Sequence, residues 1–374
     1  MKHSLNYRTV IIAELIPVAS IGASFGCKPR HGILNYVNPL QQQSDVLAKV
    51  YDAALLDLDG VIYIGDDAVP AVIPVLNDMH STHGIALTCI TNNAARSAHT
   101  VATHLQRLGL KVTENDVVTS AQAAATELAR LLPQGSPVFI LGSPDLAKEI
   151  ELVGLAPSQD PDQQYSAIVQ GYWPEMPWRM LGLASKVINS GAIWIGTNSD
   201  WTIPTSFGTS PGNGTMIQAL KIATGKEPKL IAGKPESPLM YSAIARTDSK
   251  KPLMIGDRLD TDILAANRIG IDSLLVFSGV TDFAELFNAT PELRPTYLAW
   301  DASGIEQSHS AVEVDHGLVS LHNWRVAGDG LSGQGDALDA IRALAVAVWE
   351  LVISPAQALQ ALAERGISLP KGEG

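Results

Sequence analysis

Residues 55–61 of the chain read LLDLDGV, an apolar run followed by two aspartates, Asp57 and Asp59. Carboxylates this close together repel each other, so the pair indicates a site where a cation or a reaction uses them. The apolar run predicts a strand, and an open α/β sheet carries its chemistry at the carboxyl ends of its strands. An isolated pair of this kind can also belong to a turn or a helix cap. Motifs elsewhere in the chain are therefore needed to tell a catalytic pair from a structural one.

The chain beyond Tyr51 alternates short apolar runs with helical stretches, which predicts βαβ units and a parallel sheet. Several of the apolar runs end in polar residues, namely Asp57, Thr91, Asn198 and Asp257. In a doubly wound sheet these ends share one edge, so the polar residues should converge there. The expected strands are residues 53–58, 85–90, 138–141, 167–170, 192–195, 253–255 and 273–277. The expected helices include residues 97–108, 120–132, 177–190, 215–224 and 261–269.

The order of these patterns predicts an α/β fold with a doubly wound parallel-sheet core and an inserted α/β cap domain. Residues 49–122 and 231–303 should form the core, and residues 123–230, which hold strands and helices of their own, should form the cap. A domain inserted into a loop at the sheet edge would lie over the polar strand ends.

The two ends of the chain differ from its middle. After Ser303, strand-like runs at 311–314 and 318–321 precede a helix at 336–351, and SPAQ at 354–357 predicts a capping box with proline at the first helical position. Residues 304–374 should therefore form a small C-terminal α+β module. Residues 1–48 are expected to be a poorly ordered extension, or to precede a true start of translation near Val46, because Glu14 and Pro17 interrupt the apolar stretch that a signal peptide would need.

The composition narrows the class of protein. The chain has 374 residues, of which 46% are hydrophobic and 17% charged, and it carries a formal net charge of −12. Such a charge argues against nucleic-acid binding, which requires basic surface. Cys27 and Cys89 lie too far apart for a zinc site or a disulfide framework. We expect a cytoplasmic protein with neither a nucleic-acid nor a membrane partner.

Three further motifs carry groups that bind phosphate or a metal. TNN at residues 91–93 follows an expected strand and can hold a phosphate through a hydroxyl and backbone amides, although such turns are common. Lys234, in the sequence GKP, can neutralise a phosphoryl group, although a lone lysine is more often a surface residue. GDRLDTD at residues 256–262 offers oxygen ligands that suit Mg²⁺ rather than zinc, although aspartate also favours the first turn of a helix.

Together and in this order, the four motifs resemble those of the haloacid dehalogenase-like (HAD) hydrolase superfamily. The long insert between the second and third motifs resembles the cap of subclass IIA, the nitrophenylphosphatase-like group. The segments that resemble this group's signatures are residues 197–200, Pro204, and residues 211–214, 278–281 and 294–297. The resemblance covers residues 49–304.

The resemblance implies a role for each matched residue. Asp57 would be the nucleophile that forms an aspartyl-phosphate. Asp59 would protonate the leaving oxygen and then deprotonate the attacking water, which favours a phosphatase over a dehalogenase. The phosphate would be held by Thr91, Asn92, Asn93 and Lys234. Mg²⁺ would be bound by the Asp57 carboxylate, the Asp59 carbonyl and Asp257, with Asp262 and Arg258 outside the direct ligands.

The cap and the tail bear on the substrate. Caps of this subclass close over small phosphorylated molecules, and Asn198 and Asp200 could bind the hydroxyls of a polyol, with Asp200 disfavouring a second anionic group. Residues 173–178 could supply an aromatic wall or simply pack in the cap core. RVAGDG at residues 325–330 fits a motif of the N-acetyltransferase (GNAT) fold that binds acetyl-CoA, but the module is shorter than a complete acetyltransferase, which favours a structural or regulatory remnant. A IIA phosphatase with such a tail resembles the actinobacterial glycerol 3-phosphate phosphatases.

The leading hypothesis is therefore a Mg²⁺-dependent phosphatase for a small phosphomonoester, with glycerol 3-phosphate first. Another substrate is the alternative: a nucleotide, 2-phosphoglycolate, pyridoxal phosphate or an aryl phosphate. A phosphate-sensing binding protein and a bifunctional acetyltransferase are hypotheses of other classes. A homodimer through the cap is one assembly to test.

Overall fold

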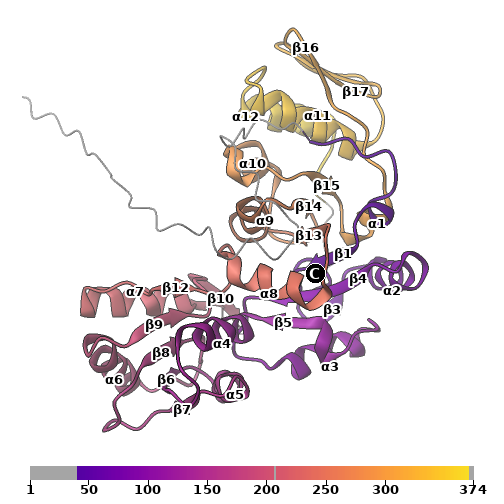
Figure 1. Ribbon diagram of the computed structural model, residues 1–374. Helices are drawn as coiled ribbons and strands as arrows, with labels where there is room; N and C mark the ends of the chain where they lie inside the picture. Colours follow the sequence, from indigo (N-terminus) through magenta and orange to yellow (C-terminus); the bar gives the residue numbers. More distant parts are fainter. Residues whose placement is uncertain (1–39, 206–207, 370–374) are drawn as a thin grey trace, which may run out of the picture.

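The computed structural model describes residues 40–205 and 208–369, and it has the predicted fold class (Figure 1). The core is built on a six-stranded sheet in the order β15-β14-β13-β1-β4-β5, in which all neighbours are parallel. Its strands are β1 (Ala53–Leu56), β4 (Ala86–Thr91), β5 (Val117–Thr119), β13 (Pro252–Gly256), β14 (Asp272–Val276) and β15 (Tyr297–Ala299). Its helices are α2 (Val72–His83), α3 (Ala98–Arg107), α4 (Ser120–Leu131), α8 (Ser237–Thr247), α9 (Leu264–Ile269) and α10 (Phe283–Phe287).

The apolar run before Asp57 forms the central strand because both of its faces are covered. Leu55 packs on one face of the sheet with Ile90 and Met254, whereas Ala54 and Leu56 pack on the other. Successive side chains of a strand point to opposite faces, so a strand buried on both sides is apolar throughout. Burying these residues places the first polar position, Asp57, at the carboxyl edge of the sheet.

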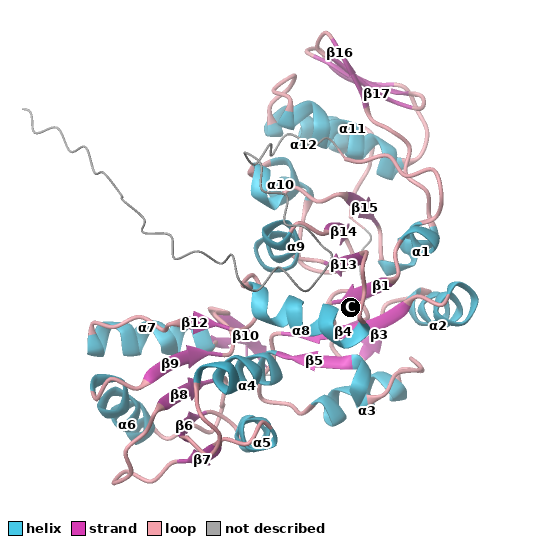
Figure 2. Cartoon of the chain, in the orientation of Figure 1, coloured by secondary structure: helices cyan, strands magenta, loops and turns pink. Residues whose placement is uncertain are grey.

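The cap has its own five-stranded parallel sheet in the order β12-β9-β8-β6-β7. Its strands are β6 (Pro137–Leu141), β7 (Ala156–Ser158), β8 (Ala167–Gln170), β9 (Ile193–Gly196) and β12 (Leu230–Ile231). Its helices are α5 (Pro144–Leu152), α6 (Trp178–Asn189) and α7 (Asn213–Thr224). An antiparallel hairpin of β10 (Thr202–Thr205) and β11 (Gly208–Pro211) precedes α7. Figure 2 shows this sheet beside the core, with α4 between the two.

The expected cap boundary at Ala123 falls inside α4, a single helix. Its buried residues share one hydrophobic cluster with the core strand β1 and the cap strands β6 and β8. A sequence pattern marks where a helix begins and ends, but not which of two sheets it covers, so the boundary could not be placed from the pattern.

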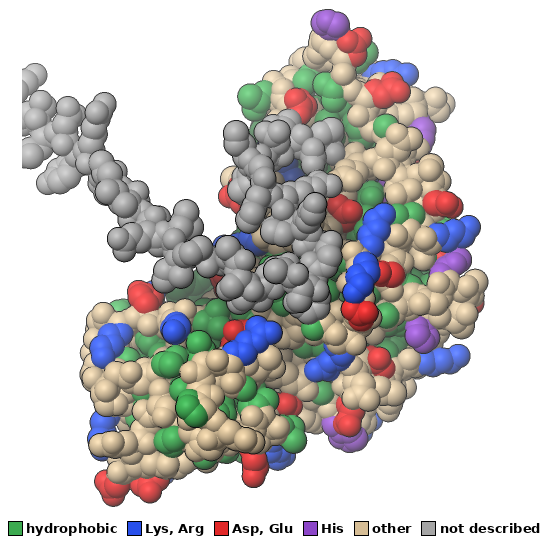
Figure 3. Space-filling model, in the orientation of Figure 1, with side chains coloured by type: hydrophobic (Ala, Val, Ile, Leu, Met, Phe, Trp, Pro, Cys, Tyr) green, Lys and Arg blue, Asp and Glu red, His purple; other side chains and the backbone are tan. Residues whose placement is uncertain are grey.

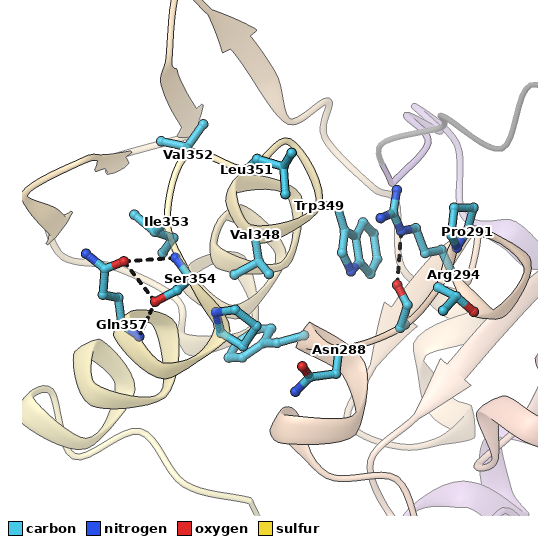
Figure 4. A pocket seen from close by; sticks show the side chains of 14 residues that line it. Asn288, Pro291, Arg294, Val348, Trp349, Leu351, Val352, Ile353, Ser354 and Gln357 are labelled. Atoms are coloured by element: carbon cyan, nitrogen blue, oxygen red, sulfur yellow. Dashed lines mark hydrogen bonds between the residues drawn. The ribbon is translucent and has the colours of Figure 1, made fainter. Parts of the chain in front are cut away.

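The C-terminal module is a four-stranded antiparallel sheet followed by two helices. The strands are β16 (Glu313–Asp315), β17 (Leu318–Leu321), β18 (Trp324–Ala327) and β19 (Gly330–Ser332), and the helices are α11 (Ala337–Trp349) and α12 (Pro355–Glu364). The capping box at Ser354 is confirmed, with the hydroxyl accepting from the Gln357 amide at 3.3 Å. Figure 4 shows the junction with the core, where the Arg294 guanidinium lies 5.0 Å from the centre of the Trp349 ring.

The RVAGDG motif does not lead directly into a helix, as a site for acetyl-CoA would require. Residues 325–327 belong to β18, residues 328–329 form the turn and Gly330 begins β19, while α11 begins only at Ala337. The Arg325 guanidinium donates to the carbonyls of His322 and Trp324, at 2.7 and 2.8 Å. A hairpin of this kind offers no helix N-terminus to a pyrophosphate, so the structure provides no support for the GNAT-like prediction.

Residues 40–48 belong to the folded core, although they were expected to be part of a poorly ordered extension. Leu40 and Leu47 are buried, and the Gln41 amide donates to the Thr296 carbonyl at 3.1 Å. A short helix, α1 (Leu47–Val50), follows. Residues 1–39, with the apolar stretch and Cys27, lie outside the described residues. Within the described ranges, no helix has the length and apolar character needed to cross a bilayer.

Candidate active site

Asp57 lies directly after β1, and its backbone amide extends the ladder to β13 by donating to the Ile255 carbonyl at 2.9 Å. The next turn requires Gly60, which has φ +84° and touches Asp257: a Cβ at this position would lie 2.5 Å from an oxygen of that carboxylate. The glycine of the LLDLDGV sequence thus allows the first and fourth motifs to approach each other.

Lys234 is the cation at the centre of the site. Its side chain is only 2% exposed, and its Nζ lies 2.7 Å from Asp57 Oδ1 and 2.6 Å from Asp262 Oδ1. Burial by itself would lower the pKa of Lys234, but the charges of Asp262 and Asp57 outweigh burial and raise this pKa above its ordinary value. Lys234 is therefore a charged, buried residue rather than the surface lysine that the isolated motif allowed.

Three carboxylates gather beside this lysine. One oxygen from each of Asp57, Asp257 and Asp262 lies within 4.8 Å of the other two. Burial, followed by the charges of Asp262 and Asp57, raises the pKa of Asp257 well above its usual range. Asp257 Oδ2 accepts from the Val280 amide at 2.7 Å, whereas its buried Oδ1 has no hydrogen-bond partner among the described residues.

This donor set fits Mg²⁺, because it consists of oxygens with neither histidine nor cysteine. The set also needs a cation, since a single lysine cannot balance three crowded carboxylates. Asp262 is the least available of the three. It is fully buried, and its oxygens already face Lys234 at 2.6 Å and the Arg258 amide at 3.1 Å.

Asp59 lies beside Asp57 and is open to solvent on one side. Partial burial, followed by the negative charge of Asp57, raises the pKa of Asp59. A raised pKa keeps a carboxyl group protonated closer to neutral pH, which suits a proton donor. Arg258, expected near the metal ligands, holds Asp262 through its amide, while its guanidinium pairs with the exposed Asp260 at 3.0 Å.

The TNN motif forms the loop that follows β4. Thr91 Oγ1 accepts from the Asn93 amide at 3.1 Å, and Asn93 Oδ1 accepts from the Ala95 amide at 2.8 Å. These contacts curl the backbone after the strand into a compact turn. The side chain of Asn92 points elsewhere and has a function that sequence reasoning missed.

Asn92 joins the core to the cap. Its amide nitrogen donates to Asp200 Oδ1 at 3.0 Å and to the Lys234 carbonyl at 2.9 Å, while its Oδ1 accepts from the Lys234 amide at 2.8 Å. Its backbone carbonyl accepts from Asn198 Nδ2 at 2.5 Å. Gly233 has to be a glycine here, because a Cβ would lie 2.5 Å from Asn92 Oδ1. No local signal predicts these contacts, since Asn198, Asp200 and Lys234 lie more than a hundred positions away in the sequence.

The structure brings both predicted cap residues to this loop. Asn198 and Asp200 follow β9, and burial raises the pKa of Asp200. A cavity of about 70 Å³ lies next to them, lined by Asn93, Tyr172, Asn198, Asp200, Thr202, Ile203, Gly212 and Asn213. The predicted aromatic wall is not part of this lining. Trp173 packs against the cap core and Trp178 is 85% exposed, whereas Tyr172, which the sequence did not single out, lines the cavity.

Comparisons with known proteins agree with this geometry. A model of haloacid dehalogenase-like hydrolases matches residues 54–156, and a HAD-hydrolase-like model matches residues 231–303. The chain is 40% identical over 315 residues to a D-glycerol 3-phosphate phosphatase from Mycobacterium tuberculosis, covering 81% of this chain and 87% of the relative.

Two solved structures are similar in fold. One is a glycerol phosphate phosphatase from M. tuberculosis in complex with magnesium, with a TM-score of 0.74 and 40% identity over 82% of this chain and 92% of that one. The other is a p-nitrophenyl phosphatase from Archaeoglobus fulgidus, with a TM-score of 0.63 and 27% identity over 68% of this chain and 98% of that one.

Proposed function

Because the chain belongs to the haloacid dehalogenase-like hydrolase family, we propose that it hydrolyses glycerol 3-phosphate through an aspartyl-phosphate intermediate. It is a phosphoric monoester hydrolase that uses Mg²⁺. The observation that carries the proposal is the buried Lys234 between Asp57 and Asp262, beside a third carboxylate. This arrangement places a cation next to the carboxylate that would attack a phosphoryl group.

In the first step, an oxygen of Asp57 attacks phosphorus and the bond from phosphorus to the ester oxygen breaks. Asp59 donates its proton to that leaving oxygen, which departs as an alcohol. Water then attacks the phosphorus of the aspartyl-phosphate and gives its proton to Asp59, and inorganic phosphate and the Asp57 carboxylate are released. One aspartate therefore serves as nucleophile and the other carries the proton, which is consistent with the raised pKa of Asp59.

Lys234 and the loop after β4 hold the phosphoryl group during both steps. Lys234 lies 2.7 Å from the attacking carboxylate, so its charge can stabilise negative charge shared between that carboxylate and the phosphate. Thr91 offers its hydroxyl and Asn92 its backbone amide at the turn, whereas the side chain of Asn92 supports the loop from behind. Bound Mg²⁺ supplies further positive charge to the phosphoryl oxygens.

The metal ligands would be the Asp57 carboxylate, the Asp59 carbonyl and Asp257. The unpaired, buried Oδ1 of Asp257 supports this assignment. Asp262 would orient Lys234 rather than bind the metal, because its oxygens are already engaged.

Phosphate release across a panel of esters with Mg²⁺ tests the proposed substrate. The panel contains both enantiomers of glycerol 3-phosphate, 2-phosphoglycolate, a nucleoside monophosphate, pyridoxal phosphate and p-nitrophenyl phosphate. We expect the highest kcat/KM with glycerol 3-phosphate, the substrate named for the M. tuberculosis relative. A nucleotide far ahead of glycerol 3-phosphate would contradict the proposal. Aryl phosphates are the second candidate, because the A. fulgidus neighbour is a p-nitrophenyl phosphatase.

Two further properties remain proposals. We place the enzyme in the cytoplasm, where its phosphorylated substrate would be made. We also propose a homodimer through the cap, where hydrophobic side chains are exposed (Figure 3) and where Leu152 and Trp178 are 78% and 85% exposed. Light scattering would measure the mass in solution, and a monomeric mass that persists at high concentration would contradict the dimer.

A further inference from the structure

We propose that the C-terminal module positions the metal ligand Asp257, because the module holds the short helix α10 to which the loop around Asp257 is attached. This inference rests on the proposed function, in which Asp257 binds Mg²⁺. It assigns Trp349, the last residue of α11, as a positioning residue that acts on the metal site through other groups. Three contacts carry it: from Asp257 to the loop after β14, from that loop to α10, and from α10 to the module.

The first contact joins Asp257 to the loop of residues 278–282, which follows β14. The Val280 amide donates to Asp257 Oδ2 at 2.7 Å, and the Thr281 amide donates to the Asp257 carbonyl at 3.1 Å. The loop thus holds both the backbone and one carboxylate oxygen of this residue. The other oxygen, Oδ1, is buried and has no hydrogen-bond partner among the described residues, so the loop determines where the free oxygen lies.

The second contact joins this loop to α10. Asp282 ends the loop and caps the helix, because its Oδ1 accepts from the Glu285 amide at 2.8 Å. The rings of Phe277 and Phe283, which lie at the two ends of the loop, meet edge to face with their centres 5.3 Å apart. A helix of five residues is too short to be stable by itself in water. The position of α10, and with it the position of the loop, therefore depends on tertiary packing.

The third contact joins α10 to the C-terminal module. The buried side chains of α10, which are Phe283, Leu286 and Phe287, share one hydrophobic cluster with residues of α11 and α12. Figure 1 shows α10 next to these two helices. The indole of Trp349 donates to the Leu286 carbonyl at 3.2 Å. The module therefore supplies part of the packing that the short helix needs.

Hydrogen exchange in the metal-free enzyme and calorimetric binding of Mg²⁺ test the proposal without relying on turnover. In Trp349→Ala we expect the amides of Val280 and Thr281 to exchange at least tenfold faster than in the wild-type protein. The Kd for Mg²⁺ should rise at least tenfold, as when a metal ligand loses the group that orients it. Circular dichroism shows whether the variant is folded under the conditions of both measurements.

The kinetic constants should separate a displaced metal ligand from a damaged phosphate site. At saturating Mg²⁺ the kcat of Trp349→Ala should return to within about threefold of the wild-type value, because excess metal ion compensates for weaker binding. The KM for glycerol 3-phosphate should also stay within about threefold, since Thr91 and Lys234, which hold the phosphate, lie on other loops. A rise in KM that Mg²⁺ leaves unchanged would overturn the proposal.

Leu321→Ala is the matched control inside the module. Leu321 lies on β17, is 2% exposed and belongs to the same hydrophobic cluster, so its loss weakens the module on the side of its own sheet. We expect Mg²⁺ binding and the exchange of the two amides to stay within twofold of wild type. Equal changes in Leu321→Ala and Trp349→Ala would assign the effect to lost stability and overturn the proposal. Wild-type exchange and Mg²⁺ affinity in a folded Trp349→Ala protein would also overturn it.

Trp349→Phe decides the question where Trp349→Ala does not fold. This variant keeps an aromatic ring but lacks the indole N–H that donates to Leu286. The two amides should exchange at least threefold faster in it, and wild-type exchange would contradict the proposal. The metal assignment fails separately, if Asp257→Asn binds Mg²⁺ as tightly as the wild-type enzyme. Faster exchange in the metal-free Trp349 variants would still show that the module holds the loop.

Discussion

At the scale of single residues, the arrangement of the site depends on how its buried charges are compensated. Burying an ion is costly unless an opposite charge accompanies it. Lys234 is accompanied by Asp57 and Asp262, whereas Asp257 keeps a raised pKa and an unpaired oxygen. The motif residues therefore have unequal roles. Lys234 pairs with Asp57, the proposed nucleophile, and Asp257 is the carboxylate most in need of a metal ion.

Replacing the nucleophile tests the central assignment. In Asp57→Asn the side chain keeps its shape but loses the oxygen nucleophile, so we expect kcat to fall at least about a thousandfold. The exposed Asp67 provides the control, and Asp67→Asn should keep full activity. Phosphate release and circular dichroism are measured for both variants. Substantial turnover in a folded Asp57→Asn enzyme would refute the assignment.

A substitution at Gly279 tests the proposal that Asp257 binds the metal ion. A Cβ at Gly279 would lie 2.0 Å from Asp257 Oδ2, so Gly279→Ala should displace that carboxylate. We expect the Mg²⁺ concentration for half-maximal activity to rise by about 10- to 100-fold, as when a metal ligand loses its support. Gly328→Ala is the matched control, because a Cβ there meets nothing within 4 Å. An identical Mg²⁺ dependence in the two variants would argue against Asp257 as a ligand.

At the scale of elements, local signals predicted boundaries well where the interacting groups are neighbours in sequence. The capping box of α12 joins Ser354 and Gln357 within one helical turn, and the predicted start of the helix is confirmed. The position of α4 depends instead on contacts with residues far away in the sequence. This helix covers both the core and the cap, and its burial depends on strands that lie far along the chain.

The cap of α12 can be tested by removing one hydroxyl. Ser354→Ala loses the acceptor for the Gln357 amide, which should reduce the local stability of α12 by about 1 kcal/mol. Amide hydrogen exchange in the first turn of α12 measures this local opening. Ser308→Ala, at an exposed serine outside the helices, serves as the control. Equal protection of α12 in the two variants would show that proline and packing alone fix the start of the helix.

At the scale of the whole molecule, the C-terminal module is an extension of the hydrophobic core rather than a separate unit. Every residue of α11 from Ala340 to Trp349 is buried, and the apolar ones share one cluster with Phe277, Phe287 and Leu298 of the core. The Trp349 indole donates to the Leu286 carbonyl at 3.2 Å. A module of about seventy residues has little core of its own, and it can remain folded because its helices bury their apolar side chains against the catalytic core.

Trp349→Ala should therefore destabilise the catalytic core as well as the module. Loss of a large buried side chain and its hydrogen bond should cost about 3–5 kcal/mol in the free energy of unfolding. Nearby Leu351 is 90% exposed, and Leu351→Ala should change this free energy by less than about 0.5 kcal/mol. Urea unfolding followed by loss of phosphatase activity measures both. A Trp349→Ala core that unfolds at the wild-type urea concentration would show that the two parts are energetically separate.

The contact between module and core should also respond to acid. His309 lies with its ring 4.8 Å from that of Tyr297 in β15, and burial, then the charge of Arg342 in α11, lowers the pKa of His309 to about 4. Between that value and an ordinary pKa near 6.5, the unfolded chain binds a proton that the folded protein does not. The contribution of neutral His309 to the free energy of unfolding is therefore fully present above a pH of about 6.5. It declines as the pH falls toward 4, by up to about 3 kcal/mol.

The melting temperature between pH 7.5 and 4.5 checks this prediction. His309→Gln removes the titrating group and should flatten the acid decline relative to the wild-type protein. Parallel declines in the two proteins would assign the acid sensitivity to other groups.

The sequence by itself determined the class of fold and the catalytic motifs, because both depend on local patterns. An apolar run that must be buried on both faces places the next polar residue at the sheet edge, and this holds for Asp57, Thr91 and Asp257 alike. Tertiary structure alone decided how these motifs are supported. The contacts of Asn92 with Asp200 and Lys234 span 108 and 142 positions, the cavity beside Asn93 is bounded by separate segments, and α11 is buried by residues from two sheets. Packing of this kind depends on which surfaces meet after the strands have paired, and no local pattern of residues encodes that.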